Sequence, residues 1–337
     1  MTAGLRVRKA GPSVTIQDLG RPGHIAVGLS QGGAADCIAL IEGAALLRQS
    51  PDLAAIEMAG MGGAFEAMED IRIALTGAPM PASIDAKPLA WNASHAMAAG
   101  QVLRIGAARR GCYGYLHLGG GVATDPFMGS RATHLVSGIG APLAVGDTIP
   151  AGADPNAAAA GLILPEADRF SGGTVRILPS VHTALFAEKT RTRFTATQFT
   201  RTARGNRQGV ELAFDGDGFT AENQLSILSE PMIAGDIQMT GAGMPFVLLP
   251  ECQTTGGYPR IGTVLPDDLP LVAQAMPGTA LRFAFLDYAE ALAAHRPLEA
   301  RYRDLCRAAA PLVRDPRDMA DLLGYQLVSG AITGWED

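Results

Sequence analysis

The chain has 337 residues, more than the roughly 100–200 residues of one ordinary domain, so we expect two domains. Hydrophobic residues make up 47% of the chain and charged residues 18%, which favours a large core and excludes global disorder. The net charge of −6 and the lack of an uncharged apolar run of about 18 residues argue against nucleic acid or a membrane as partners, and we expect a cytoplasmic location.

The first part of the chain has the pattern of short strands joined by tight turns. A helix is predicted over Ala34–Leu47, because apolar residues repeat there at helical spacing and Asp36 lies near its start, where a carboxylate favours the helix dipole. Around this helix, apolar runs are bounded by Gly, Pro or Asp, which is typical of strands and their turns. These runs predict strands at Leu5–Arg8, Val14–Gln17, Ala55–Met58, Ile71–Thr76, Val102–Ile105 and Tyr113–Leu118.

Residues 151–173 are rich in Ala, Gly and Pro and are predicted to be a linker between domain 1 (residues 1–150) and domain 2 (residues 174–286). Residues 287–337 have a helical pattern, interrupted at Pro297, and are predicted to form a tail that packs across both domains. The strands predicted in domain 2 are Thr174–Leu178, Phe194–Ala196, Gly209–Leu212, Leu225–Leu228, Ile237–Thr240, Phe246–Leu249 and Ala280–Phe285.

Two nine-residue segments suggest that the two domains are copies of one β-fold. Ile73–Pro81 reads IALTGAPMP and Ile237–Pro245 reads IQMTGAGMP, so six of nine positions agree. We therefore predict that the two segments occupy equivalent strand–turn–strand positions. Domain 2 has 14 more residues before its next matching glycine than domain 1, and this extra length contains Gln253–Gly262 (QTTGGYPRIG), which is either a grafted functional loop or a long hairpin turn.

Several familiar sites are absent from the sequence. None of the three lysines lies in a Gly-Lys-Ser/Thr motif, so there is no P-loop. No histidines are spaced as a metal-binding pair, so no metal site is predicted. Gly60–Phe65 lacks the third glycine of a dinucleotide-binding fingerprint and is interpreted as a turn. The widely spaced cysteines predict reduced and mostly buried thiols: Cys37, Cys112, Cys252 and Cys306.

Polar residues in glycine-bounded clusters are the remaining candidates for a site. Together they supply carboxylate, guanidinium, amide and hydroxyl groups, which suit a small amide, lactam or acid whose carbonyl is to be polarised. An Asp18–Arg21 turn clasp and solvated loops are the structural alternatives. The candidate catalytic residues are Asp18, Arg21, Arg207 and Thr255, and the candidate substrate-binding residues are Gln17, Asn206, Glu230, Gln238, Thr254, Gly256, Gly257 and Tyr258. We expect these clusters to converge on one cleft between the domains.

Ten segments carry a resemblance to a known family. They resemble the carboxyltransferase-domain proteins, which include the C subunit of prokaryotic 5-oxoprolinase, the allophanate-hydrolase-subunit-2 group and half of the carboxyltransferase region of urea carboxylase. The segments are TIQDLGRPG (Thr15–Gly23), GGAAD (Gly32–Asp36), IEMAGMGGAF (Ile56–Phe65), ALTGA (Ala74–Ala78), YLHLGGGV (Tyr115–Val122), MGSRAT (Met128–Thr133), GNRQGVEL (Gly205–Leu212), SEPMIAGDIQMTGAGMP (Ser229–Pro245), QTTGGYPRIGTV (Gln253–Val264) and MPG (Met276–Gly278).

The resemblance implies a mainly β fold of two tandem cyclophilin-like β-barrel domains with a few helices and a helical C-terminal tail. It further implies one component of an ATP-dependent 5-oxoprolinase that acts with two partners, a B-like carboxyltransferase-domain protein and the A component of the enzyme, with ATP shared with these partners. One alternative is a carboxyltransferase of a biotin-dependent urea or amide carboxylase. In that case biotin arrives on a separate carrier, because no lysine here is flanked by methionines. A second alternative is a non-catalytic antagonist of a kinase inhibitor.

Overall fold

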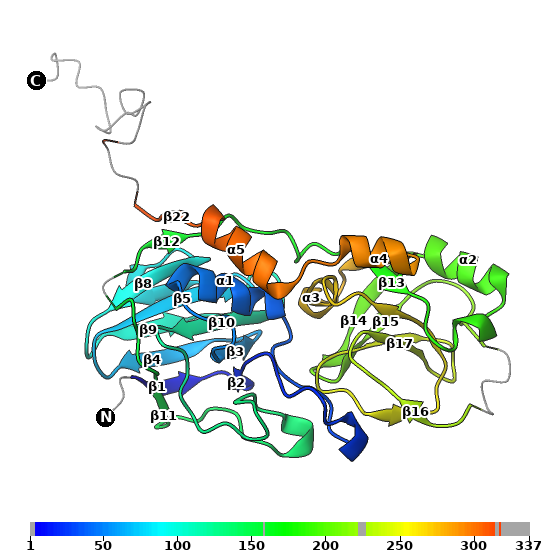
Figure 1. The fold of residues 1–337 in the computed structure, drawn as a ribbon, viewed down its shortest axis with the longest axis horizontal. Coiled ribbons are helices and arrows are strands. Elements are labelled where there is room, and N and C mark those ends of the chain that lie inside the picture. The colour runs from blue at the N-terminus through cyan, green and yellow to red at the C-terminus, as the bar shows by residue number, and fades with distance from the viewer. Residues whose placement is uncertain (1–3, 158, 222–226, 314–316, 318–337) are drawn as a thin grey trace, which may run out of the picture.

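The computed structural model describes residues 4–157, 159–221, 227–313 and 317, and it places two β-rich halves side by side (Figure 1). Few helices are present in the described ranges, and the C-terminal helix α5 lies over the first half. The predicted fold class, mainly β with two tandem β-domains, a few helices and a helical C-terminal segment, is therefore confirmed, and in the described residues the second domain is a closed barrel whereas the first consists of two sheets. No helix in these ranges has the length and apolar character needed to cross a lipid bilayer.

The first half consists of two β-sheets around a shared apolar core. Leu5, Phe65 and Leu103 from one sheet meet Ile56 and Leu116 from the other, and all five are fully buried. The first sheet contains, in order, β11 (Thr148–Pro150), β1 (Gly4–Ala10), β4 (Gly63–Ala67), β9 (Val102–Ile105), β6 (Ala82–Ile84) and β7 (Lys87–Pro88). The second contains β2 (Val14–Gln17), β3 (Ala55–Ala59), β10 (Tyr113–Leu118), β5 (Ile71–Gly77), β8 (Ala93–Met97), β12 (Leu162–Ile163) and β22 (Ala310–Pro311).

Helix α1 (Cys37–Leu47) packs on the second sheet and is buried for most of its length. Asp36 caps its N-terminus, where the carboxylate accepts a hydrogen bond from the Ala39 amide at 3.1 Å. The helix begins three residues later than predicted. Gly43 lets the helix approach the sheet closely, because a Cβ at this position would lie 2.2 Å from the imidazole ring of His117.

The second half is a closed β-barrel whose apolar core continues into the contact with the first half. Val175, Phe199 and Phe283 fill the barrel, and the same cluster includes Leu40 and Tyr115 of the first half. The barrel order is β13 (Gly173–Leu178), β20 (Arg260–Val264), β17 (Asp236–Met239), β18 (Pro245–Leu248), β15 (Gly209–Ala213), β14 (Phe199–Asn206) and β21 (Ala280–Phe285). Further short elements are β16 (Glu230–Pro231), β19 (Thr255–Gly256), α2 (Glu188–Ala196), α3 (Leu269–Gln274) and the 3-10 helices η1 (Ile25–Val27), η2 (Leu135–Ser137) and η3 (Thr183–Leu185).

The structure corrects three local predictions. The strand predicted at Phe194–Ala196 is wrong, because these residues end helix α2, where Phe194 is buried against Phe199 and Phe283. Aromatic and threonine residues favour strands on average, but here tertiary packing determines the conformation. Gly60–Phe65 is only partly a turn, since β4 begins at Gly63. Half of the predicted strand Leu225–Leu228 lies outside the described residues, and the described half, Ile227 and Leu228, is not part of a strand.

The two repeated segments differ in strand pairing. In Ile237–Pro245 the flanking strands β17 and β18 pair with each other as a hairpin. In Ile73–Pro81, β5 pairs instead with β8 and β10, and the next strand, β6, lies in the other sheet. The prediction of equivalent strand–turn–strand units is therefore wrong in its pairing. Nor is Gln253–Gly262 a simple insertion, because it forms β19 and the beginning of barrel strand β20.

The connecting segment and the tail both pack against the first half. Within residues 151–173, β12 pairs with β8 and with β22. The tail forms α4 (Tyr288–Ala294) and α5 (Leu298–Ala308), and α5 packs on α1 through Tyr302 and Leu305. The described part of the tail therefore crosses from the second half to the first. The further helical pattern expected near residues 319–330 lies outside the described residues.

Candidate functional site

A cavity of about 620 Å³ lies where the two halves and the tail meet. One wall comes from residues 19–38, which lead from β2 into α1, and the opposite wall comes from residues 232–234 and 250–270 of the second half. His295, Arg296, Leu298 and Arg301 of the tail complete it. Most of the lining is apolar, and the volume falls within the range of about 300–1,000 Å³ typical of small-molecule sites.

Arg21 is the candidate catalytic residue that lines this cavity. Its side chain is 1% exposed and is anchored on the neighbouring 127–132 loop, with Nη2 donating to the Ala132 carbonyl at 2.5 Å and Nε donating to the Phe127 carbonyl at 3.4 Å. Its Nη1 has no hydrogen-bond partner. Burial lowers the pKa of Arg21, an effect that the negative charges of Asp18 and Glu251 oppose.

Asp18 and Gln17 are buried next to Arg21 but have other partners. The Asp18 carboxylate accepts hydrogen bonds from the Ser130 hydroxyl and the Arg131 amide, both at 2.6 Å, and from the Gly20 amide at 2.8 Å. Gln17 Nε2 donates to Thr133 O at 3.1 Å. Asp18 therefore joins two loops of the first half, and no direct Asp18–Arg21 clasp is present among the hydrogen bonds and ion pairs of the described residues.

Arg207 joins the two halves behind the cavity wall. Its Nε donates to Glu251 at 2.5 Å, its Nη1 donates to Glu57, and its Nη2 donates to the Gly33 carbonyl at 2.5 Å. Both glutamates are 1% exposed, and their charges raise the pKa of Arg207 above its usual value although burial opposes this shift. Every nitrogen of this guanidinium is occupied, so Arg207 is suited to positioning the cavity wall rather than to contacting a substrate.

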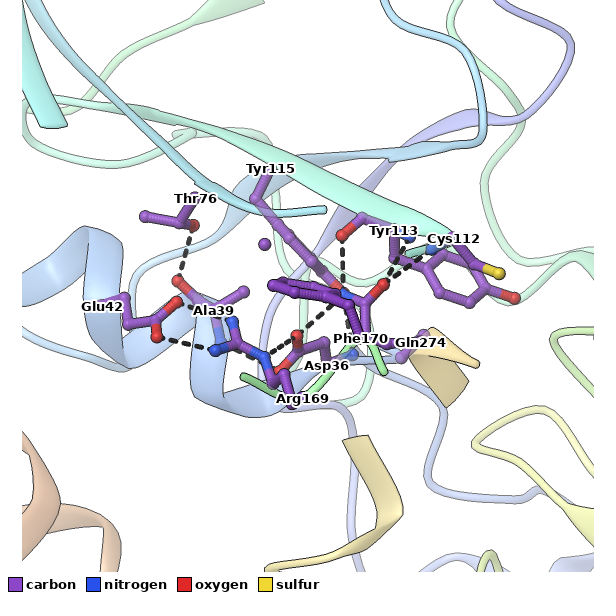
Figure 2. A network of polar contacts seen from close by, with 12 residues as sticks. Asp36, Ala39, Glu42, Thr76, Cys112, Tyr113, Tyr115, Arg169, Phe170 and Gln274 are labelled. Atoms are coloured by element: carbon purple, nitrogen blue, oxygen red, sulfur yellow. Dashed lines mark hydrogen bonds and ion pairs between the residues drawn. The ribbon is translucent and has the colours of Figure 1, made fainter. Parts of the chain in front are cut away.

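The buried network continues from Glu57 to helix α1. Glu57 accepts a hydrogen bond from Tyr115 Oη at 2.6 Å, and Tyr115 Oη in turn accepts one from the Asp36 amide at 2.8 Å. Asp36 also binds Arg169 Nε at 2.6 Å (Figure 2). These bonds make a continuous polar path from the second half through the first half to the connecting segment.

Arg169 and Gln274 fix the connecting segment and helix α3 at the other end of this path. Arg169 also binds both carboxylate oxygens of Glu42, at 2.8 and 2.7 Å, while Gln274 donates to Asp36 at 2.8 Å (Figure 2). Burial raises the pKa of Glu42, and the charge of Arg169 opposes that shift. Two carboxylates held by one arginine in a buried site fix the connecting segment on the first half with specific geometry.

His134 lies beside the cavity in its neutral form. Its Nδ1 accepts a hydrogen bond from the Ser137 amide at 3.3 Å, so Nε2 carries the proton and donates to the Ser30 hydroxyl at 2.8 Å. Burial lowers the pKa of His134, and the charge of Glu251 opposes that shift. The imidazole therefore holds Ser30, which lines the cavity.

The other candidate residues form a second group on the barrel. Glu230 binds Arg260 at 2.7 Å, and the Gln238 amide oxygen accepts a hydrogen bond from Gln253 at 2.7 Å. Thr255 and Gly256 pair with β16 as strand β19. Of the remaining candidates, the Thr254 carbonyl accepts a hydrogen bond from the Met232 amide, and the Asn206 side chain closes a turn by accepting one from the Gln208 amide. Gly257 packs near Ser229, and Tyr258 is 49% exposed. None of these residues lines the cavity.

The structure thus brings together only Gln17, Asp18, Arg21 and Arg207 of the predicted set. The sequence analysis missed their buried partners, chiefly Glu57 and Glu251. A usable signal exists: Glu57 interrupts the apolar strand β3, and a carboxylate at such a position needs a buried cationic partner. The identity of that partner is not visible in the sequence, because Arg207 is 150 positions away.

The described residues include no group of three or more His, Cys, Asp or Glu side chains placed to hold a metal ion. All four cysteines are free thiols, as predicted; Cys252 is buried, and the other three are partly buried. Burial raises the pKa of Cys37, on the cavity wall, to about 12, so this thiol stays protonated and unreactive at neutral pH.

Residues 27–285 match the family model described as carboxyltransferase domain, subdomain A and B. The chain is 32% identical to the C subunit of 5-oxoprolinase from Haemophilus influenzae over 289 residues, which cover 85% of this chain and 92% of that protein. It is 30% identical to the C subunit of 5-oxoprolinase from Escherichia coli over 305 residues, 89% and 97% of the two chains. The crystal structure of Kluyveromyces lactis urea carboxylase superposes with a TM-score of 0.80 at 20% identity over 94% of this chain and 31% of that chain, a likeness of fold alone.

Proposed function

Because the chain belongs to the carboxyltransferase-domain family of subdomains A and B, we propose that it is the C subunit of an ATP-dependent 5-oxoprolinase, which opens 5-oxoproline to glutamate. One observation carries this proposal: two proteins named as the C subunit of 5-oxoprolinase match the chain at 30% identity or more over at least 85% of its length. In this proposal the chain acts with a B-like partner and with the A component of the enzyme.

The buried side chains around the cavity have suitable chemistry for binding a lactam. Charged hydrogen-bond donors held in a fixed position bind a negatively charged oxygen of a substrate, and they do so most strongly where water is excluded. Arg21 has such a donor at the cavity, and its position is set by the loop that Asp18 ties to β2. Arg207 keeps the wall in place from the opposite half. The proposed roles are therefore substrate contact for Arg21 and positioning for Asp18 and Arg207.

An exposed apolar surface next to the cavity supports the requirement for a partner. Val27 and Val136 are 74% and 54% exposed, and Phe127 is 56% exposed. The loops that carry them are joined by the bonds from Arg21 to Phe127 and Ala132 and by the bond from Ser30 to His134. Adjacent exposed apolar side chains mark protein–protein contacts more often than isolated ones do. We assign ATP binding to the assembled complex, since this chain has no P-loop.

The test is reconstitution. The chain is purified, mixed with the B-like and A-like proteins encoded in the same genome, and assayed for glutamate formation from 5-oxoproline with and without ATP. We expect ATP-dependent turnover only when all three proteins are present. Equal turnover without this chain contradicts the proposal.

A biotin-dependent carboxyltransferase is the second candidate, and the description of the matching family model as a carboxyltransferase domain favours it. The discriminating assay supplies a carboxylated biotin carrier protein and urea to this chain with its B-like partner. Carboxyl transfer to urea, together with no glutamate formation in the reconstitution, replaces the first proposal with the second.

A further inference from the structure

The guanidinium of Arg21 differs from those of the other buried arginines near the cavity in its hydrogen bonding. Arg207 and Arg169 use their nitrogens on carboxylates or carbonyls, whereas Nη1 of Arg21 has no hydrogen-bond partner. Six buried side-chain nitrogen or oxygen atoms in the described part of the chain share this property, and Arg21 is the only one of their residues that lines the cavity. A buried N–H group without a partner is unfavourable, so a ligand atom that accepts its hydrogen bond gains binding free energy.

A glycine of the cavity wall lies next to this buried nitrogen. Gly32 lines the cavity with φ of +64°, and a Cβ there would lie 3.7 Å from Arg21 Nη1 and 3.1 Å from the His134 ring. Any other residue at position 32 would crowd the space in front of the guanidinium. Leu29, Ala34 and Ala35, all buried, form the apolar wall around it, while Pro22 and Ile25 are exposed at its rim.

The remaining charges on the cavity wall are already neutralised. Asp267 binds His295 at 2.9 Å and Arg301 at 2.5 Å, and Arg296 pairs with Asp304. Near Arg21, the carboxylates of Asp18 and Glu251 hydrogen-bond to other groups and already balance part of its charge. The cavity therefore has one buried guanidinium nitrogen without a hydrogen-bond partner, on a wall that is mostly apolar. That combination suits a small group with one negative charge attached to an apolar body.

We propose that this cavity binds a small monocarboxylic acid, with its carboxylate accepting a hydrogen bond from Nη1 of Arg21 and its remaining atoms packed against the apolar wall. The choice of 5-oxoproline as the natural ligand rests on the proposed function, since 5-oxoproline is itself a monocarboxylic acid. The site rests on the geometry of the cavity and of Arg21. Arg21 is thereby assigned to the carboxylate, and the lactam carbonyl is left to donors elsewhere in the assembled complex.

The test measures binding to the full chain by isothermal titration calorimetry. The probes are 5-oxoproline, 2-pyrrolidinone, which keeps the lactam but lacks the carboxylate, and inorganic phosphate. We expect 5-oxoproline to bind at least tenfold more tightly than either of the other two. Equal binding of 2-pyrrolidinone overturns the role of the carboxylate, and tighter binding of phosphate overturns the ligand class.

Two variants probe the site from opposite walls. Arg21→Gln removes the guanidinium, and Ile38→Trp on α1 fills the cavity without altering Arg21, so it keeps the test valid if Arg21→Gln does not fold. We expect each to weaken 5-oxoproline binding at least tenfold. The control is Arg104→Gln, an exposed arginine on β9 outside the cavity, which we expect to bind as the unaltered chain does. Thermal melting reports on folding in all three.

The site and the function fail in different ways. If the reconstituted complex turns over 5-oxoproline and Ile38→Trp leaves both binding and turnover unchanged, the cavity is not the site, and the proposed function stands. If the chain binds 5-oxoproline in a manner that depends on Arg21 but the complex produces no glutamate, the carboxylate site stands and the proposed function is wrong. If 5-oxoproline binds neither to the full chain nor to the complex, the proposed carboxylate site is wrong.

Discussion

Arg207→Ala is expected to lower the free energy of unfolding by about 3–5 kcal/mol, the usual cost of removing one partner from a buried ion pair. The magnitude follows from what the substitution leaves behind. Glu57 and Glu251 are each 1% exposed and lose their shared cation, and the Gly33 carbonyl loses its donor. Because Glu57 lies in the first half and Arg207 in the second, the substitution also weakens the contact between the halves.

The assay is urea unfolding followed by circular dichroism and by tryptophan fluorescence. A matched control exists three residues earlier: Arg204, 81% exposed, pairs with Glu211 at 2.9 Å, and Arg204→Ala is expected to cost less than about 1 kcal/mol. We expect the two signals to change together in the unaltered chain and to separate in Arg207→Ala, as the halves lose cooperativity. Loss of stability in Arg207→Ala within about 1 kcal/mol of the control, with a single transition, would refute the structural role assigned to this cluster.

The remaining predictions concern one histidine, one glycine and the exposed apolar surface. Burial lowers the pKa of His117 to about 3, so below about pH 6.5 the unfolded state binds a proton at this histidine and the folded state does not. The free energy of unfolding, measured in urea, should therefore fall by about 2 kcal/mol from pH 7 to pH 5. An unchanged free energy of unfolding contradicts this prediction. Gly43→Ala should destabilise the folded chain by about 1–3 kcal/mol, because the new Cβ would collide with the His117 ring. Alanine normally stabilises a helix interior relative to glycine, so a higher melting temperature in this variant would disprove the close contact. Val136→Asp should abolish co-purification with the B-like partner without lowering the melting temperature, and full co-purification excludes this surface as the contact.

Local sequence patterns were sufficient for most individual elements. The strands predicted at Val14–Gln17, Val102–Ile105, Tyr113–Leu118 and Ala280–Phe285 match β2, β9, β10 and β21 to the residue. Each has an apolar run bounded by turn residues, so its conformation follows from neighbours in the sequence. Phe194–Ala196 shows where this fails: its side chains suit a strand, but packing inside the barrel selects a helix.

The candidate site, like the fold, could be predicted from the sequence only in part. The glycine-bounded motif that contains Asp18 and Arg21 was recognisable from its composition, and the structure places Arg21 on the cavity. The Thr254–Tyr258 motif was equally recognisable, but it lies in the β16–β19 region of the barrel rather than with Arg21. Composition marks polar groups near glycines, and it carries no information about which distant cluster they face.

The sequence by itself determined the mainly β character, the helix near residue 37, the lack of P-loop and histidine-pair motifs, and a family resemblance extending over most of the chain. Only the tertiary structure decided that the second half closes into a barrel, that Arg207 binds Glu57 and Glu251, and that Arg21 faces a cavity. The physical reason is the range of the interactions. Strand and helix patterns depend on residues a few positions apart, whereas a buried ion pair between residues 150 positions apart depends on the packing of both halves, which no local pattern encodes.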